Sequence, residues 1–145
     1  MSSEPMSSEV ATTPFAVDLF RGLSGRCPCC GSGRMFRAFL KVSDNCSACG
    51  EELHHHRADD FPAYCVIFIV GHLIVPLVLS VETNFAPSYW VHLAIWPPAI
   101  LALSLGLLQP VKGAIVALQW RLGMHGFADA KRARADNAYV VTHGA

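Results

Sequence analysis

Residues 27–50 read CPCCGSGRMFRAFLKVSDNCSACG and contain two short cysteine hooks, residues 27–31 and 46–50, each of which ends in glycine. In each hook two residues separate a pair of cysteines, and fifteen residues lie between the two pairs. This spacing is typical of zinc sites with four thiolate ligands. Four thiolates complete the tetrahedron and leave no position for a substrate or an activated water. The pattern predicts one structural zinc ion bound by Cys27, Cys30, Cys46 and Cys49.

The thiols allow two other interpretations, a redox or metal-transfer pair and chemically inert cysteines. Cys29 lies inside the first hook, where it could replace Cys30 as a ligand or act as a spare thiolate beside the site. Cys65, further along the chain, is predicted to be a small apolar packing residue.

The segment between the hooks has a pattern typical of a β-strand. In residues 34–45, four apolar residues alternate with basic ones, namely Phe36, Ala38, Leu40 and Val42 with Arg37 and Lys41. This predicts a strand of a zinc ribbon, although some of these side chains would equally suit one face of a helix. Before the hooks, residues 14–25 place apolar side chains at helical spacing and end in glycine, which predicts a short helix.

Two long apolar segments follow the hooks. The chain of 145 residues is 52% hydrophobic and only 15% charged, with a mean hydropathy of +0.36. Residues 63–81 and 89–109 contain no Asp, Glu, Lys or Arg, and each is long enough to cross the ~30 Å hydrocarbon layer. A buried helix pair of a soluble protein would keep a polar stripe, which these segments lack. We therefore expect a transmembrane hairpin with kinks at its internal prolines, Pro76, Pro97 and Pro98.

The flanking charges predict the orientation of this hairpin. Basic residues precede the first span and follow the second, and the connecting residues 82–88 have none. The positive-inside rule then places both chain ends in the cytoplasm and Glu82 on the outer side. Four aromatic residues fit belts at the two membrane interfaces, Tyr89, Trp90, Trp96 and Trp120. In the reducing cytoplasm, paired cysteines more often bind a metal than form a disulfide.

The predicted fold class is a mainly α membrane protein, in which the transmembrane hairpin carries a small N-terminal zinc-ribbon module. We expect residues 1–13 to be a disordered tail and residues 14–61 to hold the short helix, the ribbon and a linker. The hairpin occupies residues 62–110. Residues 111–124 predict an amphipathic helix, either at the cytoplasmic interface with Trp120 and Arg121 as anchors or continuing the second span inward. Residues 125–145 predict a flexible tail.

Histidines offer a second candidate site. His54, His55 and His56 precede Asp59 and Asp60 and could bind a metal at the membrane surface, or form a solvated linker whose aspartates face the start of a helix. His72 lies in the middle of the first span, where an ionisable side chain is costly. It could form a ligand pair with Cys65, or stay neutral and hydrogen-bond to the other helix.

Several motifs occur together in one order: the hook CPCCG, the segment 33–50, the junction ADDFPA, the opening VIFIVG of the first span, and PVKGAIVALQ. The run that contains them, from Gly25 to about Arg121, covers about two-thirds of the chain, and the combination of motifs resembles the bacterial family called domain of unknown function 983. The resemblance implies a small inner-membrane protein with a cytoplasmic zinc ribbon, two spans and no established activity. The family commonly has glycine in the place of Phe61. Some relatives are encoded beside cytochrome c oxidase genes and their assembly factors.

The sequence favours a non-enzymatic adaptor that contacts a membrane-protein partner or a second copy, with a link to respiratory oxidase assembly suggested by the resemblance. The alternative is a metal- or redox-handling factor that uses Cys29 and the histidines. A net charge of zero argues against nucleic-acid binding. No nucleophile, phosphate-binding or metalloprotease motif indicates a catalytic residue or a small-molecule substrate.

Overall fold

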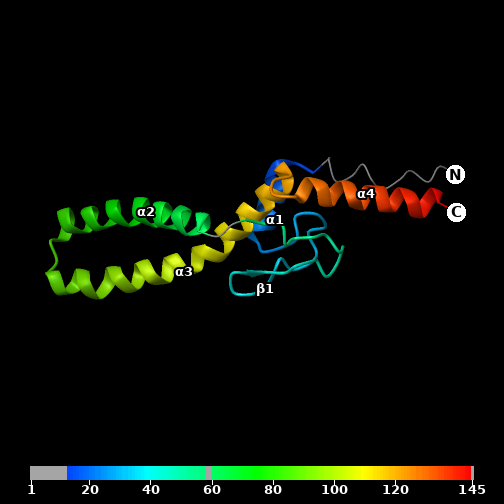
Figure 1. The fold of residues 1–145 in the computed structure, drawn as a ribbon. Helices are drawn as coiled ribbons and strands as arrows, with labels where there is room; N and C mark the ends of the chain where they lie inside the picture. Colours follow the sequence, from blue (N-terminus) through cyan, green and yellow to red (C-terminus); the bar gives the residue numbers. More distant parts are fainter. Residues whose placement is uncertain (1–12, 58–59, 145) are drawn as a thin grey trace.

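The computed structural model describes residues 13–57 and 60–144. It is mainly helical, with one small antiparallel sheet. Two long helices form a hairpin, the segment around β1 lies beside the second half of the second long helix, and the last helix extends away from the hairpin (Figure 1). The elements in chain order are α1 Phe15–Leu23, β1 Phe36–Ala38, β2 Lys41–Val42, α2 Phe61–Phe85, α3 Tyr89–Leu122 and α4 Phe127–His143.

Helices α2 and α3 contain the two predicted spans and are long and apolar enough to cross a membrane. They meet along a narrow stripe of α2 in which every fourth residue is buried, Val66, Val70 and Ile74. Only 17% of the most apolar window of α2, and none of that of α3, is buried inside the protein. The pair therefore presents an almost continuous apolar surface to its surroundings.

Helix α3 continues past the second predicted span, which is one of the two arrangements expected for residues 111–124. Its 34 residues include Pro97, Pro98 and Pro110 and give a length of ~51 Å, well beyond the ~30 Å of a hydrocarbon layer. Most of residues 111–124 therefore continue the second span and do not form a separate interfacial helix, since the chain stays helical through Pro110 to Leu122. The extension is stabilised by packing, because its buried face contacts α1 and the cysteines.

Helix α1 was expected within residues 14–25, and it crosses α3 in close contact. A Cβ atom at Gly22 would lie 2.5 Å from the carbonyl oxygen of Gly113 and 2.6 Å from the Cβ of Ala117. Glycine is therefore required where the two backbones touch. The buried carboxylate of Asp18 accepts a hydrogen bond from Arg121 in the same contact.

The segment between the hooks forms a hairpin, not the single strand expected over residues 34–45. Strands β1 and β2 pair Phe36 with Val42, and the chain reverses at Leu40, which has a φ of 60°. The reversal places Phe36 and Val42 on one buried face. Lys112 of α3 donates a hydrogen bond of 2.8 Å to the carbonyl of Leu40, which fixes the turn against the helix.

Trp120, expected in an aromatic belt, is buried inside the protein. Its side chain is 2% exposed and its indole N–H donates to Glu51 at 2.8 Å. Arg121, the second predicted interface anchor, pairs with Asp18. Both residues therefore attach other parts of the chain to α3. Of the other three belt candidates, all on α3, Tyr89 and Trp90 are exposed and Trp96 is half-buried.

The last segment, expected to be a flexible tail over residues 125–145, forms α4 between Phe127 and His143. Alanines and basic residues favour a helix here, and contacts of Lys131 and Arg134 attach its first half to the rest of the protein. The disordered tail predicted for residues 1–13 falls, except for its last residue, outside the described residues.

Candidate metal centre

The two hooks fold into matching turns. In the first, the N–H of Gly31 donates to the carbonyl of Cys27 at 2.8 Å; in the second, the N–H of Gly50 donates to Cys46 at 2.9 Å. Gly31 and Gly50 have φ values of 69° and 71°, in the left-handed region that glycine adopts most readily. The hooks also close on their own chain, because the N–H of Cys27 donates to Gly33 and that of Cys46 to Glu51.

These turns bring four sulfurs together. The Sγ atoms of Cys27 and Cys49 are 3.8 Å apart, those of Cys30 and Cys46 are 3.7 Å apart, and all four lie within 4.8 Å of one another. Zn–S bonds of about 2.3 Å give sulfur separations of about 3.8 Å in a tetrahedron. The four cysteines thus have the geometry of a closed metal site, and soft thiolates suit zinc.

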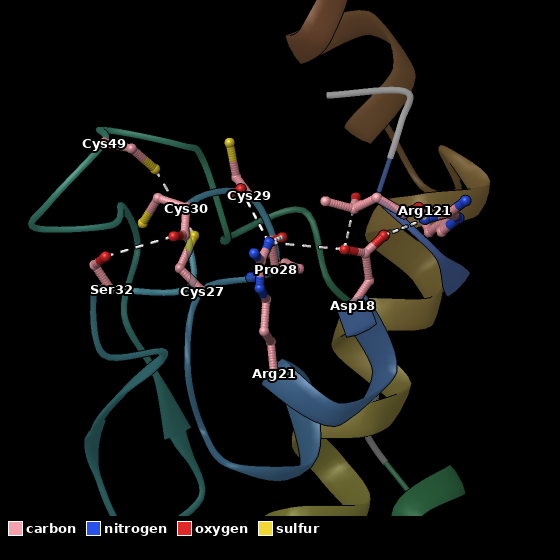
Figure 2. A network of polar contacts seen from close by, with 10 residues as sticks. Asp18, Arg21, Cys27, Pro28, Cys29, Cys30, Ser32, Cys49 and Arg121 are labelled. Carbon is pink, nitrogen blue, oxygen red and sulfur yellow. Dashed lines mark hydrogen bonds and ion pairs between the residues drawn. The ribbon is translucent and has the colours of Figure 1, made fainter. Parts of the chain in front are cut away.

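Cys29 lies outside this cluster. Figure 2 shows its sulfur directed away from those of Cys27 and Cys30. Burial, and then the negative charge of Glu51, raise the pKa of the Cys29 thiol, which keeps it protonated at neutral pH. A protonated thiol is a poor nucleophile. Because the sulfur of Cys30 belongs to the four-sulfur group and that of Cys29 does not, the geometry favours Cys30 as the fourth ligand.

The thiols of the cluster differ in acidity. Burial raises the pKa of Cys27, and it raises that of Cys49 to about 12. At Cys30, burial also acts to raise the pKa, but hydrogen bonds from the N–H groups of Gly33 and Ser32 outweigh it, and the pKa falls to about 7. Cys30 is therefore the first thiolate available to an incoming ion, and a metal must displace the protons of Cys27 and Cys49.

Each hook is anchored by an arginine from a helix. Arg21 of α1 donates to the carbonyl of Pro28 at 3.1 Å, and Arg134 of α4 donates to the carbonyl of Cys49 at 2.6 Å (Figure 2 shows the Arg21 contact). Arg134 also pairs with Glu51, which is 5% exposed and accepts the Trp120 N–H on its other oxygen. Burial works to lower the pKa of Arg134, yet the adjacent Glu51 raises it, so the guanidinium stays charged.

Sequence reasoning missed Glu51, Trp120 and Arg134, because no local pattern links residues 69 to 85 positions apart. It also missed Gly33, where a Cβ would fall on the sulfur of Cys46. The only sequence signal for a role of Gly33 was its position two residues after the end of the first hook. Nothing lies within 4 Å of a Cβ at Gly50, so Gly50 is required for its turn conformation and not for lack of space.

The histidines are arranged differently from the predicted sets. His54 and His55 lie near Glu52, not near Asp60, while Asp59 lies outside the described residues. His56 contacts the carbonyl of Leu53 through Nδ1 at 2.9 Å. His72 is exposed on α2, and its Nδ1 contacts the carbonyl of Phe68 at 2.8 Å, in its own helix. In the described part of the chain, His72 forms no hydrogen bond to α3 and none to Cys65.

Comparison with known proteins identifies the family of this chain. The sequence profile of DUF983, described as a protein of unknown function, matches residues 36–120. The chain belongs to the DUF983 family. The match covers β1 to α3 and includes the second hook, whereas the first hook precedes it. No curated protein and no solved structure matches the chain. The four-thiol cluster of this DUF983 protein thus joins one hook inside the matched segment to one outside it.

Proposed function

We propose that this DUF983 protein is a zinc-ribbon adaptor anchored in the bacterial inner membrane, with both chain ends in the cytoplasm. One observation carries the proposal. The four-thiol cluster packs against the C-terminal part of α3, while the N-terminal part of the same helix is apolar and exposed. In such an arrangement, zinc stabilises the cysteine module (residues 26–57), and α2 and α3 attach this module to the bilayer.

Insertion into a membrane is supported by the surface of the helices. Bulky apolar side chains along both α2 and α3 are exposed, among them Phe68, Leu79 and Leu101. An apolar surface of this extent is unfavourable in water and favourable in hydrocarbon. At the connecting end, Glu82 contacts His92 at 2.9 Å and His92 accepts the Trp96 N–H at 2.8 Å, a polar cluster suited to a membrane interface.

A binding role fits the metal centre better than a catalytic one. The four sulfurs close the coordination sphere, so a bound zinc would have no open position for a substrate. Two shallow apolar concavities lie along α2, lined by residues such as Tyr64, Phe68 and Val75, and they are separate from the cluster. These features support a structural zinc ion and function through protein contacts.

The proposed partner is a membrane protein or a second copy of this chain. The cysteine module and α1 also expose large apolar side chains, namely Phe20, Leu23 and Phe39. Such side chains supply contact area to an interface. Because the family resemblance includes relatives encoded beside cytochrome c oxidase genes, an assembly component of a respiratory oxidase is the first partner to test.

The experiment combines metal analysis with crosslinking in native membranes. Wild-type protein is expected to contain one zinc ion in the four-thiol site and to crosslink to a membrane partner that includes an oxidase assembly component. Cys46→Ser should lose the zinc and the partner, whereas Cys65→Ser, outside the cluster, should retain both. Partner capture that survives loss of the zinc would contradict the adaptor, and capture without any oxidase component would contradict the respiratory link.

A further inference from the structure

A second group of metal-ligating side chains lies outside the four-thiol cluster. One carboxylate oxygen of Glu52 and one ring nitrogen each of His54 and His55 lie within 4.8 Å of one another. The Nε2 of His55 is 2.7 Å from Oε2 of Glu52, and the Nε2 of His54 is 4.0 Å from the same oxygen. Metal bonds of about 2.0–2.2 Å place neighbouring ligand atoms about 3.3–3.6 Å apart in a tetrahedron. The observed separations bracket this range, so small side-chain rotations suffice to bind one ion.

The local backbone directs these side chains to one side. Leu53, between Glu52 and His54, is fully buried, and its N–H donates to the carbonyl of Asp44 at 2.8 Å. Because side chains alternate along an extended segment, turning Leu53 inward places its two neighbours outward on the same face. Glu52 is also fixed by a bridge to Asn45. The turn after Leu53 then returns His55 to this face.

His55 is further oriented by the start of α4. Its ring packs edge-on against Phe127 with centroids 5.7 Å apart, and Phe127 is fully buried. A Cβ on Gly126 would lie 3.1 Å from Nδ1 of His55, so the backbone closely approaches this side of the ring. The other nitrogen, Nε2, is the one that faces Glu52. Contacts with a helix more than seventy residues away therefore aim one ring nitrogen at the carboxylate.

We propose that Glu52, His54 and His55 form a second metal site, which takes a divalent cation of the zinc type. Two imidazoles and one carboxylate suit zinc, whereas four thiolates form the closed structural site. Three protein ligands leave at least one coordination position for water, so this site is open and its ion exchangeable. The Glu52 side chain is 48% exposed, which gives an ion access from solvent.

The test uses the full chain without an affinity tag of histidines, purified in detergent, and zinc alone as the probe. Calorimetric titration of metal-free protein should show two zinc equivalents, with the weaker one lost in Glu52→Gln and in His55→Ala. Glu52→Gln keeps the size of an exposed side chain, so its effect does not depend on the packing of Phe127. His143→Ala, which changes an exposed histidine at the far end of α4, should keep both equivalents.

Cobalt(II) added to protein already loaded with one zinc equivalent provides the second readout. Ligation by nitrogen and oxygen should give visible d–d bands without a thiolate-to-cobalt charge-transfer band. A single zinc equivalent in the wild type, a second equivalent that survives Glu52→Gln, or a second equivalent with thiolate charge transfer would each overturn the inference. In the first two cases zinc analysis of Cys46→Ser would still report on the four-thiol site, so the proposed function would stand separately; in the third, zinc retained by the same sample would show whether cobalt had displaced it.

Discussion

The guanidinium of Arg134 in α4 donates a hydrogen bond of 2.6 Å to the main-chain carbonyl of Cys49, one of the four clustered cysteines. A second nitrogen of the same side chain pairs with the buried carboxylate of Glu51. Since Glu51 also accepts the N–H of Trp120 in α3, one carboxylate joins the second hook to two helices. The C-terminal helix is therefore part of the support of the metal centre.

Replacement of Arg134 by alanine should destabilise the zinc-loaded protein. It leaves one oxygen of a carboxylate that is 5% exposed without its partner, and an unsatisfied buried acceptor costs about 1–3 kcal/mol. Chemical denaturation in detergent measures this loss. Arg132→Ala is the matched control, because Arg132 pairs with Asp129 at 3.9 Å on the surface, where both side chains are at least 80% exposed, and such pairs contribute little. Equal effects of the two substitutions would contradict the role given to Arg134.

A larger residue at the contact between α1 and α3 should also reduce stability. Gly22→Val would place its Cβ against the backbone of Gly113, and overpacking of this kind costs about 1–3 kcal/mol. Limited proteolysis should then cleave the segment around α1 faster than in the wild type. Gly106→Ala is the control, because nothing lies within 4 Å of a Cβ at that position of α3. Unchanged proteolysis of Gly22→Val would show that the two backbones do not meet as described.

The metal-free and zinc-loaded proteins should respond to pH in opposite directions. Burial raises the pKa of Cys27 and Cys49, so the folded metal-free protein retains protons that the unfolded chain releases above about pH 8.5. The contribution of Cys27 and Cys49 to the free energy of unfolding is therefore complete below that pH and is lost as the pH rises toward their pKa in the folded protein. The pKa of Cys30 is lowered to about 7, so its contribution increases with pH, but one thiol does not offset two.

With zinc bound, the thiols are deprotonated and protons compete with the metal, so stability should fall as the pH decreases. Denaturation midpoints between about pH 6 and pH 10, with chelator or with zinc and always with reductant, test both trends. A metal-free midpoint that does not fall at alkaline pH would contradict the burial of Cys27 and Cys49.

Features encoded by neighbouring residues were predictable. The cysteine spacing predicted the two hooks and the glycines that end them, because one turn spans only a few residues. The apolar segments predicted α2 and the first part of α3, since hydropathy is a local property of the chain. The strand pattern was predicted less well, because the reversal at Leu40 places a non-glycine residue in the left-handed region, which periodicity does not reveal.

Features that depend on two distant segments were not predictable. Trp120 suggested a membrane interface from its position after an apolar segment, yet it is buried against Glu51, 69 residues earlier. Residues 125–145 resembled a free tail because their anchor, Arg134, binds partners at the second hook. In each case the polar groups are paired only once the cysteine module, α3 and α4 are assembled together.

The closeness of the two hooks gives the last prediction. Gly33 follows the first hook, and its carbonyl accepts the N–H of Cys27, while a Cβ at this position would fall on the sulfur of Cys46 in the second hook. Gly33→Ala should displace that ligand and weaken zinc binding by roughly 10–100-fold, the range found for residues that support metal ligands. Competition with a chromogenic chelator measures the affinity. Ser32→Ala, at the exposed neighbouring position, should bind zinc like the wild type, and equal affinity of Gly33→Ala would show that the hooks do not approach each other this closely.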